Sequence, residues 1–310
     1  MAPPGAGKTS RLLIPTILRE CLDRRHNWGR RPPWRSFVAS DSKGELVRAT
    51  SRAARRHHDV YLLDFLRPER SHRWNPLAHI RTSLDADLFA ETIVANTGRG
   101  KDQFWEQLSK GLIAGGALYL VRTARERTPT LADLRALLAK GSPEEVLSIL
   151  AVSNIPEIAA GAAMLARGMA DNERMKGAAF ADLQNRLRWV DHPPLAAVTA
   201  GDEIALAAFG TRPTALYIRF DQNRTELLAP LTALFYAQLF DTLMDQAAAN
   251  PSGRLDVPVM FYAAHLRDQC RSEIMRGEVC CVSSPISWPG VLQLSRPAGS
   301  FLFPPSESPS

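Results

Sequence analysis

Hydrophobic residues recur along this chain in two different patterns. Short apolar runs bounded by turn residues predict buried strands at 36–40, 59–64, 214–220 and 257–262. Longer segments with apolar residues at helical spacing predict helices at 9–22, with a kink near Pro15, and at 45–56 and 226–249. Because strands and helices alternate in this order, we predict an α/β fold built on a parallel sheet with right-handed crossovers.

Between 82 and 199 only the helical pattern is present, and no strand candidate interrupts it. Thr130 followed by Asp133 is typical of a capping box, and Pro143 suits the first turn of a helix. The predicted helices are 85–96, 102–125, 130–140, 143–151, 155–170 and 172–190. We therefore predict an all-α domain at 82–199, inserted into a sheet domain made of residues 1–81 and 200–262.

The first nine residues have the pattern of a phosphate-binding loop, G-x-x-x-x-G-K-[ST], with Ala2 in place of the first glycine. Glycine at positions 5 and 7 lets successive backbone N–H groups point at one anion. Lys8 would reach the outer phosphates, the hydroxyl of Thr9 would bind Mg²⁺, and the helix that follows would add its positive end. The predicted nucleotide-binding residues are Gly5, Ala6, Gly7, Lys8, Thr9 and Ser10.

A chance glycine-rich turn is the alternative interpretation of this loop. A phosphate loop normally connects a strand to a helix, and that strand lies in the middle of the sheet. No residue precedes Met1 to form the strand, so we expect the chain to be truncated at its front.

Composition is that of a globular protein, with 45% hydrophobic and 23% charged residues in 310, enough for one large or two ordinary domains. The four cysteines show neither CxxC nor Cys/His ligand spacing, so we predict neither a disulfide framework nor zinc. We recognise no signal peptide. The longest apolar stretch, 112–121, is shorter than the ~20 residues of a spanning helix, which predicts a cytoplasmic chain as given.

The net charge of +6 is unevenly distributed. Residues 1–81 hold 17 Lys and Arg against 7 Asp and Glu, a net +10, and the remainder holds 21 against 25, a net −4. A basic block beside a phosphate loop suits a protein that handles polyanions. Arg48, Arg52 and Arg55 recur about once per helical turn and are candidate DNA-binding residues, with weak and non-specific binding. A solvated basic surface is the alternative.

Asp41 follows directly after the strand at 36–40 and precedes a predicted helix. An acid at the end of a strand beside a phosphate loop is placed to contact a metal-bound water, which makes Asp41 a candidate catalytic residue together with Lys8. N-capping of the following helix is the alternative role for Asp41.

Several short motifs, in this order and spacing, resemble one family: the coupling proteins of type IV secretion systems, which are conjugative DNA transfer ATPases. The resemblance covers residues 2–262. The motifs are the loop at 2–9 with the following Ile14-Pro15, Ser40-Asp41-Ser42-Lys43-Gly44-Glu45-Leu46, Trp74-Asn75-Pro76-Leu77, Phe104-Trp105-Glu106, Pro129-Thr130-Leu131 and Gly210-Thr211-Arg212-Pro213-Thr214.

This resemblance implies a RecA-like P-loop motor, split by an all-α domain and using ATP and Mg²⁺. Members of the family are homo-hexamers anchored in the inner membrane, with the motor on its cytoplasmic face. They recruit a relaxase–DNA complex or secreted effector proteins to the components of the secretion channel.

The sequence departs from the family pattern after Tyr262. The strand that ends there resembles the Walker B strand, which should continue into Asp-Glu, whereas this chain continues Ala263-Ala264-His265-Leu266. We also expect the family's amino-terminal transmembrane helices to be absent from these 310 residues. Residues 263–310 contain three of the four cysteines, nine serines and six prolines, without strand–helix alternation. A frameshift after the codon of Tyr262 would produce such a segment, and a natural divergent tail is the alternative.

Two functional hypotheses follow. In the first, the chain is an active coupling ATPase that drives DNA transfer. In the second, it is a degenerate fragment without hydrolysis that keeps only fold or docking roles, because a motor of this kind needs the two missing acids. An unrelated P-loop enzyme such as a small-molecule kinase is disfavoured, because nothing resembles a lid or an acceptor site. The sequence leaves open whether the chain is an enzyme.

Overall fold

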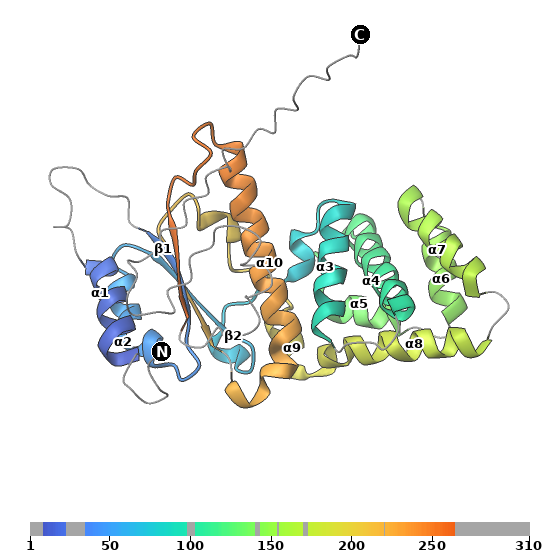
Figure 1. The fold of residues 1–310 in the computed structure, drawn as a ribbon, viewed down its shortest axis with the longest axis horizontal. Coiled ribbons are helices and arrows are strands. Elements are labelled where there is room, and N and C mark those ends of the chain that lie inside the picture. The colour runs from blue at the N-terminus through green and yellow to red at the C-terminus, as the bar shows by residue number, and fades with distance from the viewer. Residues whose placement is uncertain are drawn as a thin grey trace, which may run out of the picture.

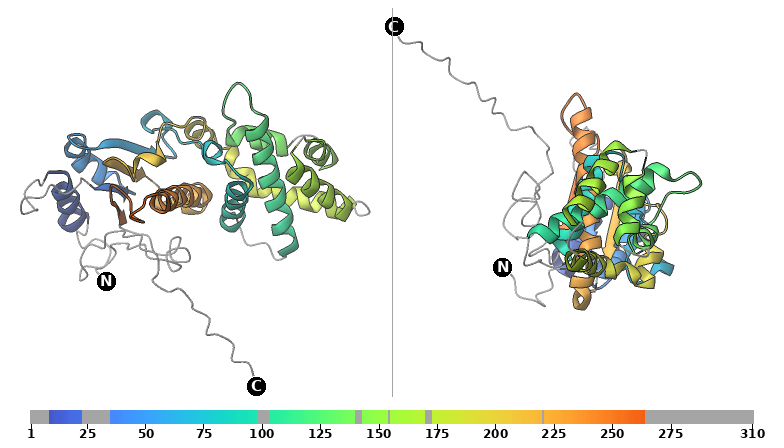
Figure 2. Two further views of the ribbon diagram at one scale, coloured as in Figure 1. Left: turned by 90° about the horizontal axis from the view of Figure 1, so that it is seen from above. Right: turned by 90° about the vertical axis from the view of Figure 1, so that its right-hand side faces the viewer.

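The computed structural model of the chain describes residues 9–22, 35–97, 103–139, 143–153, 155–169, 173–219 and 221–263. The phosphate loop up to Lys8 and the tail from Ala264 lie outside these residues. Figures 1 and 2 show a sheet flanked by helices and, beside it, a block made only of helices.

The sheet consists of parallel strands, as predicted, with the order β2-β3-β1-β4 among the described residues. Their bounds are β1 Ser36–Ser40, β2 Asp59–Asp64, β3 Thr214–Arg219 and β4 Val259–Ala263. Every position of β1 is buried, as is typical of a parallel sheet covered on both faces. The last strand begins two residues later than predicted, although the Pro258 carbonyl still accepts a hydrogen bond from the Ser36 N–H at 2.9 Å.

One face of the sheet is covered by α1 (Ile14–Leu22) and α2 (Glu45–Ala54), which pack against each other. A π-helical turn, η1 (Thr9–Leu13), leads into α1 and changes to α-helix beside Pro15, where we predicted a kink. Leu13, Ile17 and Leu46 pack on this face in one buried cluster with Phe37 and Tyr262. The apolar stripes of the two helices therefore form the core on this side.

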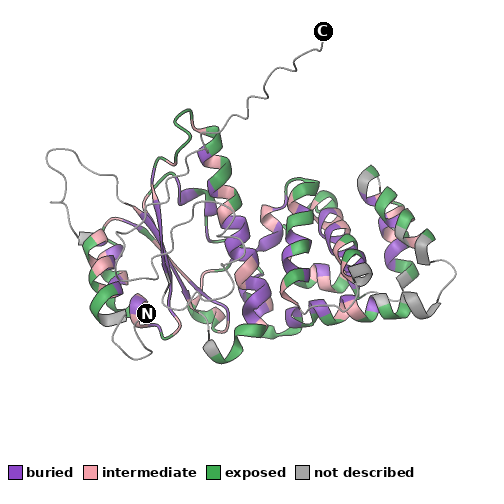
Figure 3. Ribbon diagram, in the orientation of Figure 1, coloured by how far each residue is buried: buried purple, intermediate pink, exposed green. Residues whose placement is uncertain are grey.

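The opposite face is covered by α10 (Thr225–Ala249), which also contacts α3 of the helical block. One buried cluster runs from Val38 of the sheet through Phe235 of α10 to Phe89 of α3, so the core is continuous between sheet and helices (Figure 3). By length and composition, α10 is the one described helix able to cross a membrane, yet 56% of its most apolar window is buried within the protein.

Among the described residues, the chain between β2 and β3 contains helices and no strand, as predicted. Thr82 with Asp85 and Thr130 with Asp133 form complete capping boxes at the starts of α3 and α5, and α6 begins at Pro143 as predicted. The helices are α3 Ser83–Asn96, α4 Gln103–Thr123, α5 Leu131–Leu138, α6 Pro143–Ala151, α7 Pro156–Met169, α8 Glu173–Leu187 and α9 Pro193–Val198.

The sequence prediction was incomplete where the helical block ends. We expected one helix to run to Val190, but α8 stops at Leu187 and a 3₁₀ turn, η4 (Arg188–Asp191), follows. The six-residue helix α9 was not predicted, because a helix of this length is too short to show the helical period. The short 3₁₀ turns η2 (Pro68–Arg70), η3 (Pro76–His79), η5 (Leu206–Ala208) and η6 (Gln222–Arg224) were also not predicted.

The Trp74-Asn75-Pro76-Leu77 motif joins the helical block to α10. Trp74 is fully buried and lies edge-to-face on Phe235, with ring centroids 5.1 Å apart. Asn75 Nδ2 donates to the Pro129 carbonyl at 2.8 Å, and Gln238 Nε2 donates to the Pro76 carbonyl at 2.8 Å. Buried polar groups are costly unless paired, so these bonds hold the segment in one conformation.

Candidate nucleotide-binding edge of the sheet

The predicted phosphate loop precedes the first described helix without a break. Gly5, Ala6, Gly7 and Lys8 lie outside the described residues, and the structure describes only the backbone of Thr9 and Ser10. That backbone begins η1, so a helix starts directly after Lys8, as a phosphate loop requires. The roles of the loop residues remain predictions.

An ion pair shows at which edge of the sheet this helix begins. Arg35, just before β1, lies 3.3 Å from the carboxylate of Glu20, near the end of α1. Since α1 ends beside the start of β1, its first residues lie toward the opposite edge, where the strands have their carboxyl ends. In open α/β sheets, ligands bind at that edge.

Asp41 occupies the carboxyl end of β1 and is 3% exposed. Its Oδ1 accepts the N–H of Glu45 at 3.0 Å and its Oδ2 accepts the N–H of Val47 at 2.9 Å. Both carboxylate oxygens thus satisfy backbone donors in the first turn of α2, where a negative charge is favourable. Asp41 therefore caps α2, which is the alternative to a catalytic role that the sequence left open. A role in activating water would have to use the remaining lone pairs, and it stays a prediction.

The glycine of the same loop is required by its conformation and by a neighbour. Gly44 has φ of 73°, in the left-handed region, and precedes the first residue of α2. A Cβ placed on Gly44 would lie 3.1 Å from Cζ of Arg219, closer than a side chain normally approaches. The loop after β1 and the guanidinium at the end of β3 are therefore packed against each other.

Arg219 and Asp64 are polar residues of this edge that we did not predict. They end β3 and β2, they are partners in register, and Nη1 of Arg219 lies 3.3 Å from Oδ2 of Asp64. At the end of β1, Ser40 Oγ bonds the hydroxyl of Tyr236 at 3.0 Å. The sequence contained a signal for these two residues, because the apolar runs 59–64 and 214–219 each end in a charged residue. Pairing Asp64 with Arg219 requires the order of the strands in the sheet, which the sequence pattern does not give.

The end of β4 completes the edge. Ala263, the last residue of β4, is in register with Ser40, the last residue of β1. The next residues in the sequence, Ala264 and His265, lie outside the described residues. Burial raises the pKa of the Tyr262 hydroxyl, which has no hydrogen-bond partner among the described residues.

The described residues do not by themselves fit a Mg²⁺ ion. No group of three His, Cys, Asp or Glu that could hold a metal occurs in the described part of the chain. Asp41 already accepts two N–H groups, and Asp64 faces Arg219.

The three candidate DNA-binding arginines are exposed: Arg48 and Arg52 lie on α2 and Arg55 directly follows it, whereas Leu46, Thr50 and Ala54 of the helix are buried. Within the described ranges none of Arg48, Arg52 and Arg55 forms an ion pair, although Arg48 Nη2 donates to the Lys43 carbonyl at 3.5 Å. Arg11 and Arg19, on the adjacent η1 and α1, are also exposed. The structure thus leaves these charges available to a polyanion, and contact with DNA remains a prediction.

Fold and site together define an open parallel α/β protein with its polar groups at the carboxyl edge of the sheet. The chain belongs to the type IV secretory system conjugative DNA transfer family, whose model matches residues 1–262. It is therefore a member of the coupling proteins of type IV secretion, as the sequence motifs predicted.

Two curated relatives are proteins VirD4, of Rhizobium radiobacter and of Agrobacterium fabrum strain C58. They are 28% and 27% identical to this chain over 255 residues, which is 78% of the chain in each case. The matches cover 34% and 35% of the relatives, so the chain spans about a third of the length of these proteins.

Solved structures of the coupling protein TrwB are also similar. An unbound monoclinic form of TrwBdeltaN70 has a TM-score of 0.47 and 14% identity, covering 80% of this chain and 62% of the solved chain. A complex with the ATP analogue ADPNP has a TM-score of 0.47 and 15% identity, covering 74% of this chain and 57% of the solved chain. A further TrwB structure contains ADP and Mg²⁺.

Proposed function

We propose that this chain binds ATP through the loop Gly5–Ser10 and serves in a type IV secretion coupling protein that recruits substrates to the secretion channel. The family match over residues 1–262 is the observation that carries the proposal. The helix that starts directly after Lys8, toward the carboxyl edge of the sheet, supports it.

The substrates of such a protein would be a relaxase–DNA complex or secreted effectors. The exposed arginines of α2 would add weak and non-specific binding to DNA phosphates. A hexamer at the cytoplasmic face of the inner membrane, in contact with channel components, is part of the same proposal. The helical region at 82–199 would provide the docking surface for protein substrates.

The second candidate is a protein that binds nucleotide without hydrolysing it. Ala263 and Ala264 stand where a motor of this family needs acidic residues, and Asp41 uses both of its oxygens to cap α2. Hydrolysis depends on preorganised charge, so this arrangement favours binding without turnover. Recruitment by docking does not require turnover and would persist.

Nucleotide binding can be tested directly on the purified chain. We expect a fluorescent ATP analogue with Mg²⁺ to bind with a Kd of about 10–100 µM, which Lys8→Ala weakens by roughly tenfold or more. Lys110→Ala, at a lysine of α4 in the helical block, is the control and should bind as the wild type does. Equal binding by wild type and Lys8→Ala would refute nucleotide binding by this loop.

A further inference from the structure

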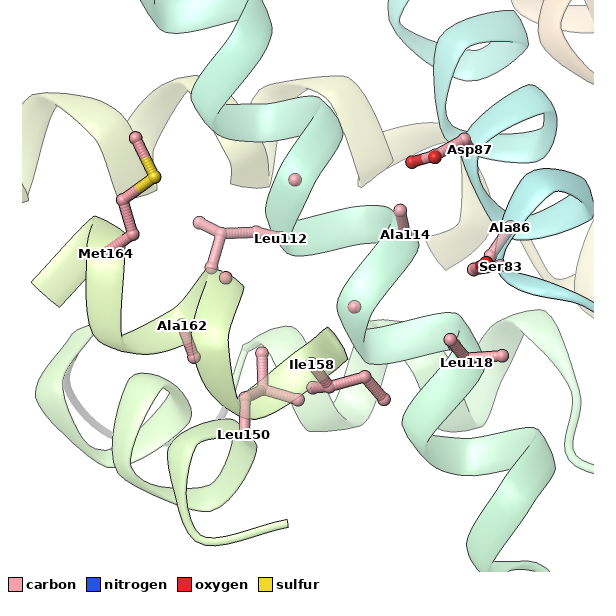
Figure 4. A pocket seen from close by; sticks show the side chains of 13 residues that line it. Ser83, Ala86, Asp87, Leu112, Ala114, Leu118, Leu150, Ile158, Ala162 and Met164 are labelled. Carbon is pink, nitrogen blue, oxygen red and sulfur yellow. The ribbon is translucent and has the colours of Figure 1, made fainter. Parts of the chain in front are cut away.

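The helical block contains an apolar cavity of about 300 Å³ between α3 and α7, with α4 as its floor. Both α3 and α7 pack on α4. Figure 4 shows Leu112 and Ala114 of α4 between Asp87 on one side and Met164 on the other. The cavity is distant in the fold from the carboxyl edge of the sheet, since α10 and α3 lie between them.

Small residues line part of this cavity. Gly111 and Gly115, one turn apart on α4, line the floor, and Gly161 of α7 lines the wall. A Cβ added to Gly161 would meet no atom within 4 Å, so the space beside it is open. Met164 at the rim is 72% exposed, and methionine adapts its shape to an incoming apolar group.

One charge at the rim lacks a counter-charge. Asp87 is exposed and forms no ion pair within the described part of the chain. Glu91, one turn further along α3, differs because its carboxylate lies 2.8 Å from Nζ of Lys110. An apolar cavity with one unpaired carboxylate at its edge is complementary to an apolar surface that carries a cation.

The cavity and its rim residues Asp87 and Met164 form a groove on the helical block. We propose that this groove binds an amphipathic helix of a partner protein, with apolar side chains in the cavity and a Lys or Arg opposite Asp87. A groove between two helices on a third matches the known mode in which a helix inserts its apolar face. The inference rests on the proposed docking role of the helical region and is independent of nucleotide binding by the phosphate loop.

The test uses the full chain and a fluorescein-labelled alanine-based helical peptide of about 18 residues, with leucines at i, i+4, i+7 and i+11 and one lysine beside them. A twin peptide has glutamate in place of the lysine. By fluorescence anisotropy we expect the lysine peptide to bind with a Kd of about 10–100 µM and the glutamate peptide to bind more weakly. Asp87→Asn should abolish this difference, whereas Glu126→Gln, at an exposed acid outside the groove, should keep it.

Gly161→Leu should fill the cavity without a clash, because the position is open, and should raise helix propensity. We expect it to weaken peptide binding by about tenfold or more while the fold stays intact. Gly177→Leu on α8 is the matched control, since a Cβ there also meets no atom within 4 Å and Gly177 does not line the groove. Both variants should retain wild-type binding of the fluorescent ATP analogue, which separates this test from that of the phosphate loop.

Three results would overturn the proposal: no saturable peptide binding, unchanged binding by Gly161→Leu, or equal losses in Gly161→Leu and Gly177→Leu. Concentration-dependent self-association that Gly161→Leu abolishes would also overturn it, because the groove would then be occupied by a second copy of the chain.

Discussion

Arg219 and Asp64 face each other at the ends of two adjacent parallel strands, with Nη1 and Oδ2 3.3 Å apart. Their side chains are 19% and 8% exposed, so the pair is largely removed from water. The guanidinium also lies against Gly44 in the loop after β1. One ion pair thus connects the carboxyl ends of three strands, beside the predicted nucleotide site.

Removal of one partner of this pair should destabilise the protein. Asp64→Asn leaves the arginine without its counter-charge, and breaking a buried pair typically costs about 3–5 kcal/mol, with the lower end expected here because Arg219 is partly exposed. Urea unfolding followed by circular dichroism measures the change. Asp59→Asn is the control, since Asp59 pairs with Arg212 at the more exposed start of β2. If the two variants lose the same free energy of unfolding, burial of the Asp64–Arg219 pair does not add to its contribution to stability.

Gly44→Ala should cost more free energy of unfolding than Gly253→Ala. Both glycines have positive φ, 73° and 65°, so both changes carry a backbone penalty of about 1–2 kcal/mol. Only at Gly44 does the new Cβ also meet Arg219, at 3.1 Å, while at Gly253 it meets open space. Urea unfolding of the two variants gives the comparison directly. If Arg219→Ala removes the difference, the extra cost arises from this contact.

The stability of the chain should fall between pH 7 and pH 5 because of His58. Burial lowers the pKa of this histidine, although backbone hydrogen bonds with Arg35 and Ala54 oppose the shift. The folded pKa lies below the unfolded value, so the unfolded state binds the proton first and stability is lost as pH drops below about 6.5. The slope from this group is at most about 1.4 kcal/mol per pH unit.

His58→Gln should flatten that pH dependence, measured by urea unfolding at several pH values. His192→Gln, at an exposed histidine, is the control and should flatten the slope less than His58→Gln does. An unaltered slope in His58→Gln would assign the pH dependence to other groups.

DNA binding by the arginines of α2 predicts a specific salt dependence. Replacing Arg48, Arg52 and Arg55 by Gln should reduce the slope of log K against log salt by up to roughly 2.7, since each phosphate contact contributes about 0.9. The control replaces Arg125, Arg167 and Arg254, which are exposed elsewhere, so that the net charge changes equally. Equal slopes for the two triple variants would mean that α2 is only a solvated basic face.

The chain should not hydrolyse ATP at the rate of a motor. Loss of one preorganised group in such a site typically costs about 10²–10³ in rate, and two acids are absent after β4. We expect turnover below about one per second with ATP and Mg²⁺. Faster turnover that Lys8→Ala abolishes and Asp41→Asn does not affect would mean that another acid completes the site. It would also contradict a frameshift after Tyr262.

Local pattern was sufficient to predict most elements. The strand at Ser36–Ser40 and the helix that begins at Pro143 were predicted at their observed ends, because strand and helix periods differ and caps mark helix starts. The capping box of Thr130 with Asp133 is likewise encoded within four residues. Family membership was also evident from short motifs in sequence order.

Contacts between distant segments could not be predicted in this way. Asp64 and Arg219 are 155 positions apart in sequence, and they meet because β2 and β3 are neighbours in the sheet. The local periodicity of the sequence carries no information on this strand order. Only the structure shows that the oxygens of Asp41 accept the N–H groups of Glu45 and Val47, at 3.0 and 2.9 Å. The groove beside Gly161 likewise exists only because α3 and α7 pack on the same helix. Sequence determines the elements because their signals are local, whereas these sites depend on packing, which brings together residues that share no local signal.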